Sequence, residues 1–250
     1  MADLKKLTYV KSFTKACEKA CLILKHTHES SQALFAAYGL ARAIRSISKQ
    51  KETKGEGKKE ISMLRGMSTD EEQDLLRSML VSAASGLDAM TKQLIREALP
   101  IIIQIDKEAL VELEKFVTRR LKDGTDDISE RTPFLARVLT APSTQKQIIE
   151  DYIGYLTKGS LQSSDELSRV TKAFGISQKE VSIDHTKLRP IFESRNRIIH
   201  ELDINFNVKR RRRNLRSEGT MKSYTETLIE LAENILKSVD SKLSKAKSHD

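Results

Sequence analysis

Hydrophobic residues recur every three or four positions along most of this chain, which is the spacing of one face of an α-helix. In the longest such segment, residues 69–98, acidic residues fill the first turn, as the helix dipole prefers. Its apolar face is wider than one neighbour requires, so we expect it to pack centrally in a bundle or at a subunit interface. Other helices are predicted at 4–26, 30–48, 106–122, 131–140, 144–158, 163–173, 186–204 and 220–245.

The predicted helices suggest three parts of the chain. Residues 1–48 form an N-terminal helical hairpin or arm, and residues 68–250 form one helical domain. Between them, residues 49–67 begin with a polar, glycine-bearing stretch without periodicity, which predicts a linker. The short apolar runs at 101–103 and 204–208 are too short for a sheet. The predicted fold class is therefore all-α, a helical bundle with an additional N-terminal helical hairpin.

Composition agrees with a helical globular protein. Glycine and proline are scarce, at 10 and 4 of 250 residues, and 38% hydrophobic content can supply a core. No apolar run approaches the roughly 18 residues of a membrane span, so we expect a cytoplasmic protein without membrane contact. Cys17 and Cys21 continue an apolar stripe, which favours small buried thiols over a metal site with His26 and His28, whose spacing matches no zinc pattern. We therefore expect no metal or cofactor.

The helix predicted at 186–204 carries a charged residue on its apolar face. Its apolar positions cluster on one side, and Arg195 falls in the middle of that stripe. A guanidinium is costly to bury alone, so Arg195 requires an anionic partner. Two partners stay open, a carboxylate such as Asp88 in a buried salt bridge, or a phosphate.

Asn196 and His200 lie four residues apart at the edge of the same stripe, within reach of whatever Arg195 holds. Imidazole can move a proton near neutral pH, and a guanidinium grips phosphate with two parallel hydrogen bonds. Together with an orienting amide, these groups suffice for metal-free cleavage of RNA by its own 2′-hydroxyl.

The segment RNRIIHELD, residues 195–203, resembles the R-x4-H signature of the HEPN superfamily, in the form with Asn after the Arg and an acidic residue after the His. The likeness covers about residues 68–245: a long helix containing LLRSMLVSAASGLDAM, the motif helix, a basic loop and a closing helix. It implies a HEPN-like bundle and a metal-independent endoribonuclease that works as a homodimer with a shared cleft. Many proteins of this kind are toxins or antiphage effectors, so an antitoxin or other regulatory protein is an implied partner.

The resemblance also implies roles for residues. Arg195 would hold the scissile phosphate, His200 would act as acid or base, and Asn196 would orient them. Asp88, Glu201 and Asp203 would be supporting residues.

The net charge of +9 and the pI near 9.4 favour a polyanionic partner, with RNA as the first candidate. After the motif helix comes a dense basic run that we expect to be exposed and to contact phosphates beside the cut. No aromatic residue is interleaved with it, so base stacking is not indicated. Two alternative interpretations of this run remain: a solvated loop that binds no ligand, and a nuclear import signal. The run consists of Lys209, Arg210, Arg211, Arg212, Arg213 and Arg216.

Three functions remain after this reading: a HEPN-type ribonuclease, a non-catalytic HEPN-like module that binds RNA or protein, and a helical interaction protein in which Arg195 forms a structural salt bridge. No glycine-rich phosphate loop, metal-ligand spacing or Ser or Cys nucleophile with a nearby base points to other chemistry.

Overall fold

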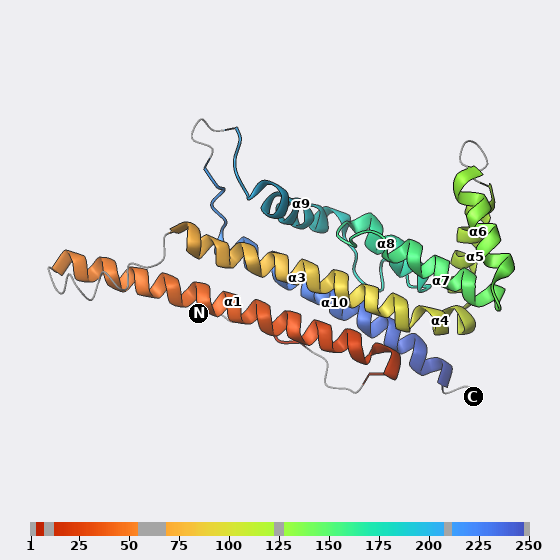
Figure 1. Cartoon of the computed structure of the whole chain (residues 1–250). Helices are drawn as coiled ribbons and strands as arrows, with labels where there is room; N and C mark the ends of the chain where they lie inside the picture. The colour runs from red at the N-terminus through yellow and green to blue at the C-terminus, as the bar shows by residue number, and fades with distance from the viewer. Residues whose placement is uncertain (1–3, 8–12, 55–68, 123–127, 208–211, 248–250) are drawn as a thin grey trace. The chain divides into compact units, whose positions relative to one another are not determined.

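The structure, a computed structural model, describes residues 4–7, 13–54, 69–122, 128–207 and 212–247 (Figure 1). These residues are almost entirely helical, and their only β pairing is a single bridge between residues 204 and 213. The predicted all-α class is confirmed. The helices are a 3-10 turn at Lys15–Cys17, α1 (Glu18–Lys54), α3 (Thr69–Glu97), α4 (Leu99–Ile105), α5 (Lys107–Lys122), α6 (Ile128–Thr140), α7 (Thr144–Thr157), α8 (Ser164–Ala173), α9 (His185–Glu201) and α10 (Glu218–Lys247).

The predicted N-terminal hairpin is wrong, because α1 is one continuous helix. We expected a break near residues 27–30, where polar side chains gather. Thr27 instead bonds the carbonyl of Ile23 at 2.7 Å, and the His28 ring donates to the carbonyl of Lys5 at 2.9 Å. Thr27 is satisfied within the helix and His28 by a segment outside it, so neither side chain requires a turn at this point. The helix also takes in residues 49–54 of the predicted linker; residues 55–67 lie outside the described residues.

The chain divides into two compact units, which are described separately. Unit 1 comprises residues 1–10, 23–87 and 186–230, and unit 2 comprises residues 11–22, 88–185 and 231–250. This division does not follow the boundaries predicted at residues 48 and 68. The candidate motif at residues 195–203 belongs to unit 1.

In unit 1, α1 and α3 lie side by side and bury apolar residues between them (Figure 1). Their approach is close at Gly86, where a Cβ atom would lie 2.1 Å from Oγ1 of Thr27. An ion pair of 2.9 Å joins Arg45 of α1 to the buried carboxylate of Glu72 on α3. Apolar residues of α9 and of the start of α10 are also buried in this unit.

In unit 2, α5 contacts α4, α6, α7 and α8. Its Phe116 lies against Phe134 of α6 and Tyr152 of α7, with ring centroids 6.3 and 4.9 Å apart. Cys17 is fully buried, and burial raises the pKa of its thiol to about 12, whereas Cys21 is half-buried. Among the helices described, none has the length and hydrophobicity required to cross a membrane.

Candidate functional site

Helix α9 carries the candidate motif and begins at His185, one residue before the start of the helix predicted at 186–204. One side of the helix packs into unit 1 through Leu188, Ile191, Phe192 and Ile198. Ile199, the apolar residue after Ile198, has an exposed fraction of 38%. The buried face of the helix therefore ends at Ile198, and residues 199–202 are exposed.

Two of the three residues of the predicted catalytic group, Asn196 and His200, are exposed on α9. Arg195 is half-buried, and its Nε atom lies in the interior. Nη1 of Arg195 donates a hydrogen bond of 3.0 Å to Oδ1 of Asn196. Asn196 and His200 are four residues apart, so their side chains project from neighbouring turns of the same face. The amide therefore lies between the guanidinium and the imidazole along the helix surface.

The helix ends at Glu201 in a turn that aims the acidic residues of the motif in different directions. Glu201 is exposed, and its carbonyl accepts a hydrogen bond of 3.0 Å from the N–H of Ile204. Leu202 and Asp203 both have positive φ angles, 49° and 59°. Asp tolerates this left-handed conformation better than most residues, because its short side chain can bond locally. The turn carries Asp203 back into the interior, where it is fully buried.

Asp203 is the centre of a buried ion cluster. Nε of Arg77, on α3, donates to Oδ2 of Asp203 at 3.0 Å, and Arg216 donates to both carboxylate oxygens at 2.9 and 2.5 Å. The Asn214 amide adds a bond of 3.0 Å to Oδ1. Asp203, which was predicted to be a supporting residue, therefore fixes the conformation of the chain after α9.

The pKa of Asp203 reflects this cluster. Burial alone raises the pKa of a carboxyl, but the hydrogen bonds from Arg216, Asn214 and Arg77 outweigh it and hold the pKa of Asp203 below its ordinary value of 3.8. Asp203 is thus charged at neutral pH.

A second carboxylate, Asp74 on α3, extends the cluster. Arg213 bonds both of its oxygens, at 2.9 and 2.6 Å, and Arg77 donates to Oδ1 at 2.9 Å. Asp74 is half-exposed, and its pKa is also lowered: burial works against this shift, but the hydrogen bonds from Arg213 and Arg77 prevail.

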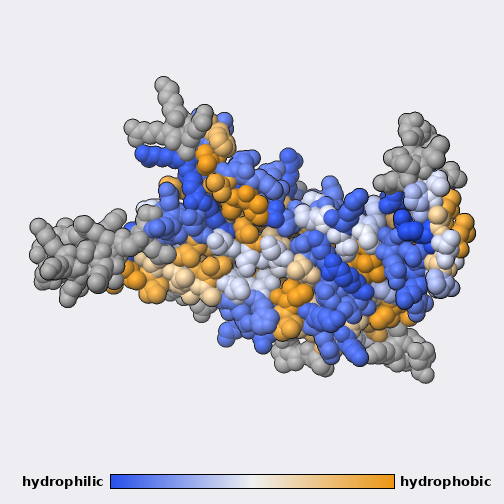
Figure 2. All heavy atoms as spheres, in the orientation of Figure 1, coloured by the Kyte–Doolittle hydropathy of each residue, from blue (hydrophilic) through white to orange (hydrophobic). Residues whose placement is uncertain are grey.

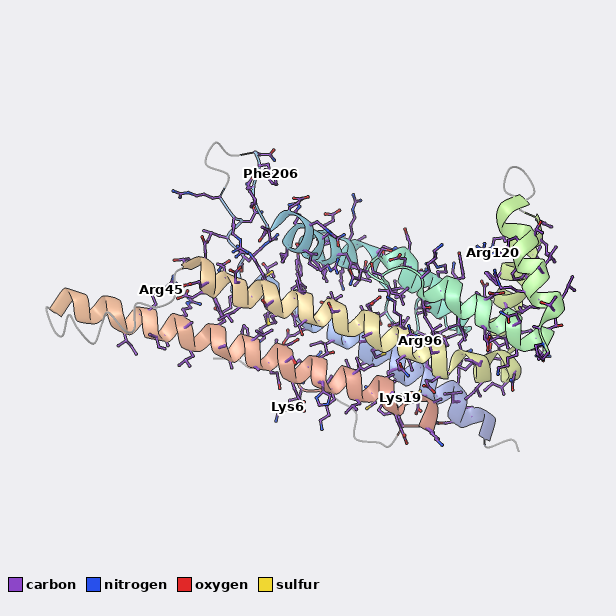
Figure 3. The ribbon with its side chains drawn as sticks, viewed as in Figure 1. Lys6, Lys19, Arg45, Arg96, Arg120 and Phe206 are labelled. Carbon is purple, nitrogen blue, oxygen red and sulfur yellow. The ribbon has the colours of Figure 1, made fainter. Side chains whose placement is uncertain are left out.

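After the turn, residues 204–207 and 212–213 lie side by side as the two sides of an arm that leaves the body of unit 1 (Figures 1 and 3). Its two sides pair through the bridge between Ile204 and Arg213, and the N–H of Asn205 donates to the carbonyl of Arg212 at 2.9 Å. At its base, the N–H of Asn214 donates to the carbonyl of Asp203 at 2.9 Å. The cluster below therefore fixes where the arm starts and ends.

Two residues of the basic run predicted to bind RNA, Arg212 and Arg213, lie on the described part of the arm. Arg212 is exposed, as expected. The expectation of a fully exposed run is wrong for Arg213 and Arg216, which are half-buried in the ion pairs with Asp74 and Asp203. Lys209, Arg210 and Arg211 lie outside the described residues.

The remaining predicted residue, Asp88, belongs to unit 2. Its carboxylate accepts a hydrogen bond of 2.6 Å from the N–H of Leu161 and one of 2.9 Å from Nζ of Lys92. These contacts fix the chain before α8 to α3, so Asp88 has a structural role within unit 2.

Sequence reasoning missed Arg77, the largest fully buried side chain among the described residues. The signal was present, because Arg77 lies three residues before Leu80 and seven before Ala84, on an apolar side of α3. An arginine there requires a buried anion, as we argued for Arg195.

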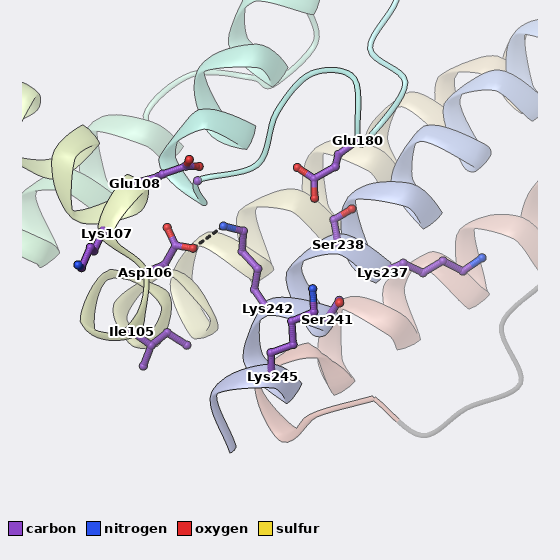
Figure 4. Close-up of a pocket in the computed structure, with 11 residues that line it drawn as sticks. Ile105, Asp106, Lys107, Glu108, Glu180, Lys237, Ser238, Ser241, Lys242 and Lys245 are labelled. Carbon is purple, nitrogen blue, oxygen red and sulfur yellow. Dashed lines mark hydrogen bonds and ion pairs between the residues drawn. The ribbon is translucent and has the colours of Figure 1, made fainter. Parts of the chain in front are cut away.

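Unit 2 contains a cavity of about 720 Å³ beside the start of α5 and the last turns of α10 (Figure 4). Four lysines and three carboxylates line it, and Lys242 bonds Asp106 across its wall. These charges nearly cancel, so the cavity has no strong preference for phosphate. No cluster of three metal-ligating side chains occurs in the described part of either unit.

Neither the protein-family models nor the curated proteins nor the solved structures with which the chain was compared give a match.

Proposed function

We propose that this chain is a metal-independent endoribonuclease of the HEPN type. The observation that carries the proposal is the arrangement on α9: a guanidinium bonded to an amide, with an exposed imidazole one turn further along the same face. The basic residues of the arm follow directly in the chain. A polyanion with a reactive phosphate fits these groups better than any other substrate class.

The residues can perform RNA cleavage without help from a metal. The 2′-hydroxyl attacks the adjacent phosphorus atom and the bond to the 5′-oxygen breaks, which leaves a 2′,3′-cyclic phosphate and a 5′-hydroxyl. The attacking hydroxyl must lose a proton and the leaving oxygen must gain one, and His200 can carry out one of these transfers. Arg195 would hold the phosphate and balance its developing charge, while the bond from Arg195 to Asn196 would keep the guanidinium in place.

The resemblance to HEPN proteins adds a homodimer to this proposal. Within the described residues the His200 ring has no hydrogen-bond or ion-pair partner, so nothing in this part of a single chain orients the imidazole. A second motif helix would supply the missing acid or base and complete a shared cleft. A toxin or antiphage effector, held in check by an antitoxin or another regulatory protein, is the role that the resemblance implies.

The His200 ring without a partner among the described residues also favours one alternative function, a non-catalytic HEPN-like module that binds RNA or protein. An imidazole that nothing orients is a poor proton carrier, and the basic arm would serve binding alone.

The two functions are separated by incubating the protein with single-stranded RNA and transfer RNA in excess EDTA, with products resolved on a denaturing gel. We expect the wild type to produce fragments ending in 2′,3′-cyclic phosphate. His200→Ala should lose on the order of 10²- to 10⁴-fold in rate, because proton transfer is removed. Arg195→Ala should lose activity while thermal unfolding stays close to that of the wild type.

The matched control is His26→Ala, which removes another exposed histidine, on α1. This variant should cut RNA at the wild-type rate. Equal cutting by the wild type and by His200→Ala would contradict the proposed site. Binding of RNA by both proteins without any cutting would favour the binding module.

A further inference from the structure

Large hydrophobic side chains are exposed close to the candidate motif. Ile199, Leu202, Phe206 and Leu215 have exposed fractions of 38, 63, 59 and 76%. Single exposed hydrophobic residues are ordinary, but four within one short segment that also carries Arg195 and His200 indicate a binding surface. Figure 2 shows hydrophobic surface where the arm meets α9, surrounded by hydrophilic residues.

Phe206 stands apart from the other three because the chain holds it away from the body of its unit. It lies on the outer part of the arm, beyond the end of α9 (Figure 3). The residue before it bonds across the arm to Arg212, and the N–H of Asn207 after it donates to Oδ1 of Asn205 at 3.0 Å. The backbone on both sides of Phe206 is therefore fixed by hydrogen bonds, while its ring faces solvent.

The charge of the arm decides which partner fits this ring. The chain has no acidic residue between Ile204 and Ser217, and it contains six basic ones there. Two of the six, Arg213 and Arg216, are neutralised by Asp74 and Asp203, and Arg212 is exposed. An interface between two copies centred on this ring would place the two basic runs against each other, whereas a polyanion with flat apolar faces would be attracted to the ring and to the run together. Nucleic acid has both properties.

No aromatic residue is interleaved with the basic run itself, but Phe206 lies three residues before it. We infer that Phe206 is a stacking platform for an unpaired nucleobase of the RNA, with Arg212 on a neighbouring phosphate. The inference rests on the proposed function and names its substrate class, which is RNA with at least one unpaired nucleotide beside the cut. Bases in a duplex are already stacked on both faces and give the ring nothing to contact. An aromatic ring contributes to binding of single strands with little dependence on sequence, because every base has a π face.

The test uses the absence of tryptophan from this chain. Phe206→Trp, in a His200→Ala background that cannot cut, places the only tryptophan of the chain on the arm, where its fluorescence can be excited selectively at 295 nm. Titration with a ten-nucleotide oligouridylate should quench this fluorescence, because a base stacked on the indole quenches it. A blunt RNA duplex of ten base pairs should bind through its phosphates with little quenching. The matched control is Leu40→Trp on α1, where the leucine is 63% exposed, and neither RNA should quench it.

Affinity gives a second readout through fluorescence anisotropy of labelled RNA. Phe206→Ala should bind the oligouridylate about tenfold more weakly than the parent protein and bind the duplex equally well. Leu40→Ala should bind both as the parent does. If Phe206→Ala loses the same affinity for both RNAs, or loses affinity for neither, the inference is overturned.

The outcomes separate this inference from the proposed activity. Quenching of Phe206→Trp without cleavage by the wild type would keep the RNA contact and reject the nuclease. Cleavage by the wild type without quenching would reject the stacking contact alone. If Phe206→Ala instead converts a dimer to a monomer in light scattering and leaves RNA affinity unchanged, the ring belongs to an interface between two copies, and the inference is wrong.

Discussion

The base of the arm and its outer part use the same residue type for opposite purposes. At the base, Arg213 and Arg216 lie in ion pairs with Asp74 and Asp203, which are themselves held by Arg77. Further out, Arg212 is exposed and only its backbone carbonyl takes part in the pairing of the arm. The first group fixes the position of the arm, and the second is available for a ligand.

The difference shows that a basic run in a sequence overstates the charge that is available to a polyanionic ligand. A third of the predicted phosphate-binding residues are already matched by carboxylates of the same chain. The comparison predicts a gradient, in which substitutions at the base change stability and substitutions further out change binding.

The largest effect is expected at Asp203. In Asp203→Asn the side chain keeps its size and its tolerance of positive φ, but two arginines lose the negative charge between them. Breaking a buried ion pair from one side costs about 3–5 kcal/mol, so we expect a loss of this order in the free energy of unfolding, measured by urea titration.

Asp74→Asn is the matched control, because it removes a carboxylate of the same cluster whose side chain is 46% exposed. Water replaces much of the lost interaction at this exposed position, so the free energy of unfolding should fall by only about 1 kcal/mol. Equal losses for both variants would show that burial does not distinguish the two carboxylates.

The pH dependence of the free energy of unfolding should follow the protonation of Asp203. Because the folded state holds the pKa of Asp203 below its ordinary value of 3.8, the charged cluster stabilises the wild type fully above that value. This contribution is lost as the pH falls through the lowered pKa of the folded state. The stability difference between the wild type and Asp203→Asn should therefore be largest near neutral pH and shrink below about pH 4. Urea titrations at a series of pH values measure it, and a difference that grows toward acid would have the wrong sign.

The sequence predicted the helices well where apolar periodicity and end signals coincide. The helix predicted at 69–98 is observed at Thr69–Glu97, and the one predicted at 106–122 at Lys107–Lys122. It failed at α1, because polar residues near position 28 resemble a turn when their tertiary partners are unknown. Periodicity describes one face of a helix and cannot show that a buried histidine finds a backbone carbonyl from a distant segment.

The motif residues could be found from sequence, but their surroundings could not. Arg195, Asn196 and His200 occupy one helix, so their relative positions follow from helical geometry. The partners of Asp203 come from α3 and from the segment after the arm, 126 and 13 residues away along the chain. Nothing local in the sequence assigns Asp203 to those arginines, and its predicted supporting role came from the resemblance alone.

A smaller effect on stability is expected at Arg213. Arg213→Gln removes the paired contact with Asp74 and the hydrogen bond of 3.0 Å to the carbonyl of Leu202. Both groups of the ion pair are partly exposed, so the free energy of unfolding should fall by about 1 kcal/mol, and less at high salt. A loss as large as that of Asp203→Asn would place Arg213 in the essential part of the cluster.

The smallest effect on stability, and a clear one on binding, is expected at Arg212. In Arg212→Gln the backbone bond from Asn205 to residue 212 is kept and only the exposed guanidinium is lost. The free energy of unfolding should stay within about 0.5 kcal/mol of the wild type. If Arg212 contacts a phosphate, the slope of log affinity for single-stranded RNA against log salt should fall by about 0.7, the value for one contact. Arg45→Gln provides the control, because Arg45 is engaged by Glu72 and should leave the salt slope unchanged. If the slope is also unchanged for Arg212→Gln, the outer part of the arm has no role in RNA binding, and the arm does not divide into a structural base and a binding outer part.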